Sequence, residues 1–142
     1  MKKDLLEVTI VGGSGYVGGE LLRLLLRHPQ VRINQVTSRK FAHLEVSLLH
    51  PNLRGITDLK FSGPDEVKPC DLIFLALPNG ESMPGMEKWL GLSEKIIDLG
   101  ADFRLKDAAE WQLWYGPEHM RPDLLPTFVY GLPEIYRQEI KS

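Results

Sequence analysis

The amino-acid sequence predicts an α/β fold, a doubly wound parallel sheet with helices on both faces. Three observations carry this prediction. Apolar, β-branched runs of strand length recur along the chain, runs with helical spacing alternate with them, and a glycine cluster joins the first strand to the first helix. With 142 residues, 43% of them hydrophobic and 25% charged, the chain has the length and composition of one ordinary globular domain.

The N-terminal part of the chain predicts a βαβ unit. Residues 7–11 form an apolar run that leads directly into glycines, as a buried parallel strand does before a tight turn. A helix is expected over residues 15–28, because apolar side chains recur there at helical spacing and Pro29 follows. Residues 31–37 alternate apolar and polar side chains, which is typical of a strand. Crossovers of this kind are nearly always right-handed.

Shorter patterns predict the rest of the fold. A continuous apolar run over residues 71–77, closed by Pro78, Asn79 and Gly80, is typical of a central parallel strand that ends in a turn. The remaining expected elements are strands at residues 59–61, 95–99 and 128–130, helices at 82–92 and 133–140, a short helix around Trp111, Trp114 and Tyr115, and a loop at 50–55.

Composition and charge exclude several classes of protein. A net charge of -2 provides no basic surface for nucleic acid and no polybasic anchor for a membrane. The apolar run at residues 72–77 is too short to cross a bilayer, and glycines interrupt the region where a signal peptide needs an apolar core. The one cysteine, Cys70, cannot form an internal disulfide. We therefore expect a cytoplasmic protein that binds neither nucleic acid nor membranes.

The glycine cluster is the main functional signal. Residues 13–18 match the spacing G-x-G-x-x-G, in which the glycines permit a tight turn, let the backbone approach a pyrophosphate and let the helix pack closely on the strand. The helix then presents unpaired N–H groups and the positive end of its dipole to the anion. This context predicts a Rossmann-like dinucleotide-binding domain, with a glycine turn that serves packing alone as the alternative. The predicted binding residues are Gly12, Gly13, Ser14, Gly15, Tyr16, Val17 and Gly18.

The end of the second expected strand predicts which dinucleotide is bound. An Asp or Glu at this place would bind the ribose hydroxyls of NAD and repel a 2′-phosphate. The sequence instead offers Thr37, Ser38, Arg39 and Lys40, which include no acid. A hydroxyl and two cations suit a 2′-phosphate, and Arg39 can bind it through paired hydrogen bonds. The cofactor is therefore predicted to be NADP(H), and a solvated basic turn is the alternative reading.

Ligands of an open parallel sheet bind outside the carboxyl ends of its strands. Residues 77–80 and 100–104 both follow expected strands, so both should border the cofactor crevice. Cys70 precedes its strand, which predicts a buried structural thiol rather than a nucleophile. Arg104 is a candidate anchor for a substrate carboxylate or phosphate, and pairing with Asp98 or Asp102 is the equally open alternative.

The remaining polar and aromatic candidates do not point to chemistry. The four histidines show no metal-ligand spacing with one another or with Cys70, so we expect surface or internally satisfied side chains and no metal site. They are His28, His43, His50 and His119. Trp111, Trp114 and Tyr115 form an aromatic cluster that is expected in a core or an interface.

Five stretches in order resemble one family over almost the whole chain. They are residues 11–21, 37–39, 74–78, 98–105 and 129–134. The sequence resembles the N-acetyl-gamma-glutamyl-phosphate reductases, together with their relatives that act on aminoadipyl phosphates held by an amino-group carrier protein. Each motif alone is common, whereas this order and spacing is specific.

The resemblance implies NADPH-dependent reduction of an acyl phosphate to a semialdehyde, with release of phosphate, in arginine or lysine biosynthesis. The reaction would pass through a thioester on a catalytic cysteine. Within this sequence, Ser38 and Arg39 match cofactor-binding positions, as do Leu77 and Pro78 beside the cofactor, and Arg104 matches the arginine that binds the substrate phosphate. The resemblance also implies a homo-oligomeric full-length enzyme. It leaves the choice between acetylglutamyl and aminoadipyl substrates open.

Two departures from the family pattern limit the expectation. The family nucleophile lies in an Asn-Pro-Gly-Cys segment after the Gly-Leu-Pro-Glu motif, and we expect that cysteine beyond Ser142. We therefore expect residues 1–142 to be an NADP-binding domain that binds the cofactor without turnover and lacks the catalytic and dimerisation domain. Asn79 stands where many relatives have a histidine.

Other functions have different sequence requirements. Short-chain dehydrogenases also open with a glycine-rich loop, but they need a Tyr-x-x-x-Lys pair that this sequence lacks. A non-catalytic NADP-binding or redox-sensing module remains an alternative, since a chain without a nucleophile would suit it. An Asn-Pro-Gly-Cys segment following in the gene would favour the reductase.

Overall fold

The computed structural model describes residues 5–142, which form two compact units. The first unit contains residues up to 77 together with residues 87–99, and the second contains residues 78–86 and 100–142. The expectation of a single NADP-binding domain over residues 1–142 stays a prediction. Among the described residues, no helix is both long enough and apolar enough to cross a membrane.

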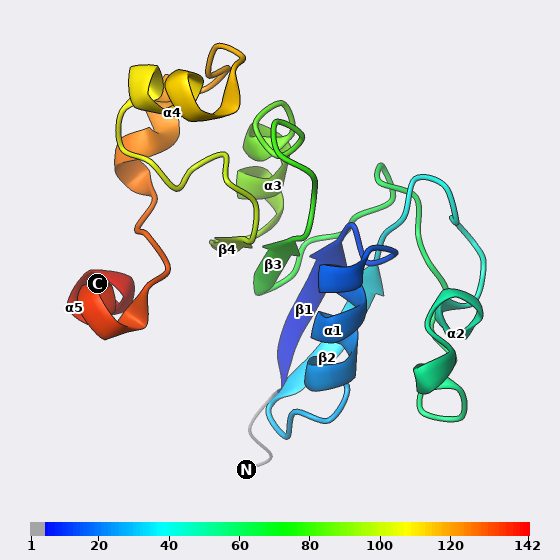
Figure 1. Ribbon diagram of the computed structural model, residues 1–142. Coiled ribbons are helices and arrows are strands. Elements are labelled where there is room, and N and C mark those ends of the chain that lie inside the picture. Colours follow the sequence, from blue (N-terminus) through cyan, green and yellow to red (C-terminus); the bar gives the residue numbers. More distant parts are fainter. Residues whose placement is uncertain (1–4) are drawn as a thin grey trace. The chain divides into compact units, whose positions relative to one another are not determined.

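The first unit is built on a parallel sheet of four strands in the order β2-β1-β3-β4 (Figure 1). The strands are β1 (Leu6–Val11), β2 (Val31–Val36), β3 (Leu72–Leu75) and β4 (Lys95–Asp98). Its helices are α1 (Tyr16–Leu25), the single turns α2 (Val46–Leu49) and η1 (Pro51–Leu53), and α3, which spans Met86–Leu92 and has its first residue in the second unit.

The strand order explains how the sheet is wound. From β1 the chain crosses outward to β2 through α1, and β3 then pairs with the other edge of β1, so the order reverses between β1 and β3. Right-handed crossovers in opposite directions carry α1 and α3 to opposite faces. The residues from Val8 to Val11 are all buried, so both faces of β1 are covered. The predicted doubly wound parallel fold is confirmed.

The helix α1 packs its apolar stripe on one face of the sheet. Leu22 lies in a cluster of buried side chains that the sheet, α1 and the segment after β2 build together. The members are Ile10, Leu22, Ile33, Val36, Val46, Leu53 and Phe61. The predicted helix is confirmed but ends at Leu25, because Arg27 and His28 donate to carbonyls three residues earlier and tighten the last turn.

Two expectations between β2 and β3 are wrong. Residues 59–61 do not form a strand and make one isolated bridge, between Lys60 and Glu45. A strand needs a continuous ladder, whereas here the buried ring of Phe61 holds the segment in place. The predicted loop at residues 50–55 contains the helical turn η1, and α2 precedes it without having been predicted.

The second unit consists of helical turns and loops. It contains α4 (Ala108–Tyr115), η2 (Pro122–Thr127) and α5 (Pro133–Lys141). The short helix around Trp111 and the final helix are confirmed. The predicted strand at residues 128–130 is wrong, because Phe128 stacks on Phe103, with ring centroids 4.3 Å apart, and the segment joins no ladder.

The predicted helix at residues 82–92 begins only at Met86. The residues before it form turns, in which Ser82 and Met83 direct their N–H groups at the carboxylate of Asp102. Pro84 has no N–H to donate, which further disfavours a regular helical start.

Candidate functional site

The turn after β1 requires glycine at its first position. Gly12 has a φ of +86°, a left-handed conformation that side chains with a Cβ rarely adopt. A Cβ at Gly12 would also lie 2.4 Å from the carbonyl oxygen of Ala76, at the end of β3. Leu77 borders the same point, since its Cδ2 atom lies 3.1 Å from that Cβ position. The turn therefore runs directly past the carboxyl end of the central strand.

Two other glycines of the turn differ in what they do. A Cβ at Gly18 would lie 2.5 Å from the Cα of Gly13, so this glycine lets α1 approach the turn closely. At Gly15 the nearest atom to a Cβ would be the Gly12 oxygen at 3.9 Å, an ordinary contact. The protein's own packing therefore does not require glycine at position 15, and the missing side chain leaves room for a ligand backbone or phosphate.

The start of α1 presents unpaired donors beside this room. Among the described residues, no acceptor bonds the N–H groups of Ser14, Tyr16, Val17 or Gly18. Together with the helix dipole, such N–H groups favour a bound anion. The glycine turn and the residues at its rim therefore fit the pyrophosphate of a dinucleotide.

An open pocket of about 390 Å³ adjoins the start of α1. Its lining residues are Ser14, Gly15, Tyr16, Gly19, Glu20, Leu49, His50, Pro51 and Asn52. The side chain of Tyr16 is 99% exposed at this rim, and that of Val17 is also exposed. Neither side chain is used by the core, so both are available to a ligand.

The end of β2 is bonded to the glycine turn through Thr37. The backbone carbonyl of Thr37 accepts a hydrogen bond from the N–H of Gly13 at 2.9 Å. The Thr37 hydroxyl accepts one from the N–H of Gly12 at 3.3 Å. This role of Thr37 is not predictable from the sequence, because nothing in the spacing of residues links it to position 12.

Ser38 extends this connection toward the basic residues. Its hydroxyl donates to the hydroxyl of Ser14 at 3.0 Å and accepts from the N–H of Phe41 at 3.2 Å. Ser38 is buried, whereas Arg39 and Lys40 beside it are exposed. The Lys40 ammonium lies 5.2 Å from the centroid of the Phe41 ring. Hydrogen bonds thus join Gly12 and Gly13 to Thr37, and Ser14 to Ser38, so that the turn and the end of β2 form one bonded group.

In the second unit, a buried carboxylate organises the loop that carries Arg104. The Asp102 side chain accepts hydrogen bonds from the N–H groups of Gly80 at 2.6 Å, Ser82 at 3.1 Å and Met83 at 3.3 Å. It also accepts from the Ser82 hydroxyl at 2.7 Å. Asp102 is fully buried. This set of bonds, which we call the Asp102 clamp, fixes residues 80–83 to residue 102.

The structure shows which contacts Arg104 and Asn79 make beside the clamp. Because the Asp102 carboxylate is surrounded by backbone donors, Arg104 does not pair with it. Within the second unit, the exposed Arg104 guanidinium has no hydrogen-bond or ion-pair partner. The Asn79 amide oxygen accepts from the N–H of Ala101 at 3.3 Å, so this asparagine supports the loop.

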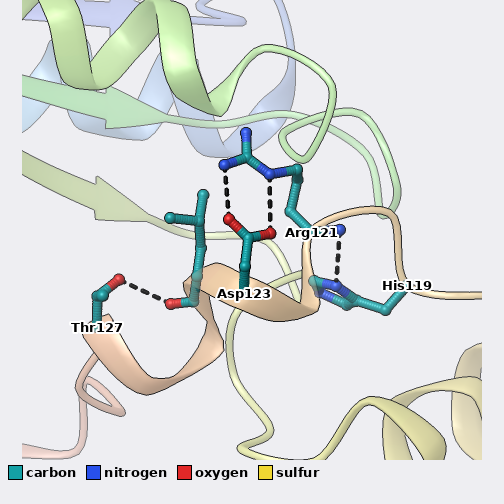
Figure 2. A network of polar contacts seen from close by, with 5 residues as sticks. His119, Arg121, Asp123 and Thr127 are labelled. Carbon is teal, nitrogen blue, oxygen red and sulfur yellow. Dashed lines mark hydrogen bonds and ion pairs between the residues drawn. The ribbon is translucent and has the colours of Figure 1, made fainter.

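His119 holds the same loop from the other side. Its Nε2 atom donates to the carbonyl of Asp102 at 2.7 Å. Its Nδ1 atom accepts from the N–H of Arg121 at 3.1 Å (Figure 2). His119 is buried and internally satisfied, as expected. Figure 2 also shows the Arg121 guanidinium on Asp123, whose pKa it lowers through hydrogen bonds.

The other candidates remain outside any site. Cys70 precedes β3, is half-buried rather than fully buried, and directs its Sγ atom at the Leu72 carbonyl at 3.5 Å. Of the aromatic cluster, Trp111 is buried and stacks on Tyr115, whereas Trp114 is exposed. Within residues 5–142, no group of side chains could hold a metal ion.

The strand order, the glycine turn at the end of β1 and the unpaired N–H groups of α1 define a dinucleotide-binding α/β domain. The family model described as "Semialdehyde dehydrogenase, NAD binding domain" matches residues 7–142. The chain belongs to this family.

Curated relatives with high identity carry two kinds of name. The chain is 53% identical over 140 residues to an N-acetyl-gamma-glutamyl-phosphate reductase of Thiobacillus denitrificans, covering 97% of this chain and 41% of that protein. It is 54% identical over 138 residues to a protein of Thermomicrobium roseum provisionally named a LysW-L-2-aminoadipate 6-phosphate reductase, covering 97% and 39%. A LysW-L-2-aminoadipate/LysW-L-glutamate phosphate reductase of Saccharolobus solfataricus is 50% identical over 143 residues, covering 99% and 41%.

The fold also has a solved counterpart. The aspartate semialdehyde dehydrogenase of Candida albicans, solved with NADP, superposes with a TM-score of 0.58 at 19% identity. The superposition covers 74% of this chain and 32% of that one. The chain spans 39% to 41% of the length of the three curated relatives above.

Proposed function

We propose that this chain is the cofactor-binding part of an NADPH-dependent acyl-phosphate reductase. Its substrate would be an N-acyl-gamma-glutamyl phosphate or an aminoadipyl phosphate, which is reduced to the semialdehyde with release of phosphate. The names of the relatives support this reaction class. Both kinds of name occur at nearly equal identity, so the two substrates are supported alike.

The observation that carries the proposal is the bonded group formed by the glycine turn and the second strand end. The unpaired N–H groups at the start of α1 would hold the pyrophosphate. Ser38, Arg39 and Lys40 would hold the 2′-phosphate, because the place where NAD enzymes carry an acid offers a hydroxyl and two cations. Leu77 and Pro78 would lie beside the cofactor.

The bound cofactor would supply the hydride that turns an acyl group into an aldehyde. The residues of this chain would bind and orient the reactants. Arg104 would hold the substrate phosphate, since its guanidinium is exposed and suits bidentate contacts to phosphate oxygens. The Asp102 clamp and His119 would keep the Arg104 loop in one conformation.

The proposal extends to partners. Two of the relatives are named for substrates joined to LysW, so an acyl phosphate presented on an amino-group carrier protein is one candidate substrate. A free small-molecule acyl phosphate is the other, in line with the acetylglutamyl name. We also propose that the full-length enzyme is a homo-oligomer.

Replacing Arg39 tests the cofactor assignment. In Arg39→Ala, the dissociation constant for NADPH should rise by about tenfold or more, because charge-assisted hydrogen bonds to the 2′-phosphate are lost. The constant for NADH, which lacks this phosphate, should change little. Fluorescence titration of the purified chain measures both. Arg27→Ala is the matched control, since Arg27 is an exposed arginine at the far end of α1. Equal losses for both cofactors would contradict the assignment.

A non-catalytic NADP-binding or redox-sensing module is the second candidate function. The observation that favours it is the position of the only thiol, Cys70, ahead of β3 rather than at the carboxyl ends of the strands. Turnover of an acyl phosphate by a longer protein that contains this chain would favour the reductase. Tight NADP binding without turnover in such a protein would favour the module.

A further inference from the structure

We propose that His50 is a positioning residue for the anion site of the glycine turn. This inference rests on the proposed function, because the anion in question is the pyrophosphate of the dinucleotide. His50 does not touch that anion in the proposal. It would act through the backbone of Gly13, and the sequence assigns it no such role.

The contact between His50 and the glycine turn joins distant parts of the chain. The His50 Nε2 atom lies 2.8 Å from the carbonyl oxygen of Gly13. Since a carbonyl oxygen only accepts, Nε2 carries the proton and donates it. No other described residue offers a side-chain donor to the Gly13 carbonyl.

The position of the imidazole is fixed by its surroundings. His50 lies between α2 and η1, where its N–H donates to the Val46 carbonyl at 3.0 Å and its carbonyl accepts from Leu53 at 2.9 Å. Val46 and Leu53 are both buried in the core of the first unit. A Cβ at Gly19 would lie 2.5 Å from the His50 Cε1 atom, so the ring lies directly on the backbone of α1.

The bond has a consequence for a donor that faces the ligand. Gly13 lies ahead of Gly15, the N-cap of α1, so its carbonyl is outside the hydrogen-bond pattern of the helix and is held by His50 instead. The trans peptide plane directs the N–H of Ser14 away from the side on which the Gly13 oxygen is held. Among the described residues, no acceptor bonds this N–H group. His50 thereby keeps the Ser14 donor available and oriented.

Replacing His50 in the 142-residue chain tests the proposal. In His50→Leu, the dissociation constant for NADPH should rise about tenfold, the effect of losing one well-placed hydrogen bond. In His50→Gln, whose amide nitrogen can donate to the same carbonyl, most of the affinity should remain. Gly19→Ala displaces the His50 ring without changing it, so it should weaken NADPH binding as His50→Leu does. This variant replaces His50→Leu in the test if His50→Leu does not fold.

A second probe separates positioning from general damage. Adenosine 2′-monophosphate carries the 2′-phosphate but no pyrophosphate, so its affinity, measured by NMR titration, should be unchanged in His50→Leu. A parallel loss for NADPH and adenosine 2′-monophosphate would overturn the proposal, as would NADPH binding at the wild-type level in both His50→Leu and Gly19→Ala.

Inorganic pyrophosphate distinguishes failure of this proposal from failure of the proposed function. If the wild-type chain does not bind NADPH, the proposed function fails. Binding of pyrophosphate to the wild-type chain, weakened in His50→Leu and retained in His50→Gln, would still support the role of His50. Pyrophosphate binding that is equal in all three proteins, or absent from all three, would overturn it.

Discussion

At the scale of single residues, Gly15 and Gly18 belong to the same turn but meet different requirements. A Cβ at Gly18 would press against the backbone of Gly13, whereas a Cβ at Gly15 would make only an ordinary contact. Gly15 also has a backbone conformation open to other residues, with φ of -82° and ψ of 177°. We therefore predict that the fold requires glycine at position 18 and that the ligand requires it at position 15.

A pair of alanine variants tests this separation. Gly18→Ala should lower the free energy of unfolding by about 1–3 kcal/mol, as overpacking does. Gly15→Ala should change it by less than about 0.5 kcal/mol. Gly15→Ala should nevertheless weaken NADPH binding by about tenfold or more, because a methyl group then occupies the approach of the pyrophosphate. Urea denaturation and fluorescence titration give the two quantities. Unchanged NADPH affinity in Gly15→Ala would contradict this assignment.

The sequence predicted the residue types of the site better than their contacts. The glycine spacing and the basic residues after β2 could be read directly, because local chemistry defines them. The bonds from His50 to Gly13 and from Thr37 to Gly12 could not, since they join residues far apart with no shared periodicity. The sequence left two roles open for Arg104, namely binding a substrate anion or pairing with Asp98 or Asp102. Because the Asp102 carboxylate accepts hydrogen bonds from residues 80–83, Arg104 does not pair with Asp102.

At the scale of elements, periodic segments were predictable and short ones were not. The strands β1 to β4 and the helix α1 have continuous apolar patterns, and all were predicted. Residues 59–61 and 128–130 also carry apolar side chains, but neither segment forms a strand. The Phe61 side chain is buried in the core, and the Phe128 ring stacks on Phe103. A short apolar run predicts that its side chains are buried, whereas tertiary contacts decide whether its backbone forms a strand.

The Asp102 clamp makes a prediction about the loops at the strand ends. Asp102→Asn should lower the free energy of unfolding by about 2–3 kcal/mol, because one amide oxygen cannot accept from all the donors and the amide N–H groups would face them. Tryptophan fluorescence during urea denaturation reports the change, since Trp111 is buried in the same unit.

The matched control for the clamp is Asp107→Asn. Asp107 caps α4 by accepting from the N–H of Glu110 at 2.8 Å. Asparagine is an equally good N-cap, so this exposed replacement should change the stability by only a few tenths of a kcal/mol, about the difference between good capping residues. Similar effects of both replacements would show that the clamp has no special contribution.

At the scale of the whole molecule, the binding elements and the thiol lie apart in the sheet. The glycine turn follows β1 at the carboxyl ends of the strands, whereas Cys70 lies ahead of β3. We therefore expect the 142-residue polypeptide to bind NADPH, which raises its melting temperature. We expect no oxidation of NADPH when N-acetylglutamyl phosphate is added, measured as unchanged NADPH absorbance. Phosphate release coupled to NADPH oxidation by this polypeptide alone would contradict the expectation.

The sequence predicted the parallel α/β class of the molecule, because a buried central strand and a glycine turn can be recognised locally and are typical of that fold class. The division into two compact units was not foreseen. It depends on which segments pack together, and residues 78–86 leave the sheet between two of its strands to join residues 100–142. No change in composition marks this exchange.

The buried carboxylate of Asp102 gives the Arg104 loop a property that matters when a ligand arrives. The backbone donors of residues 80–83 form a cradle much like those that bind free oxyanions, and the protein fills it with an anion of its own. The conformational entropy of ordering this loop is therefore lost during folding rather than during association. A phosphate that reaches Arg104 would meet a preorganised surface, and more of its contact energy would appear as affinity.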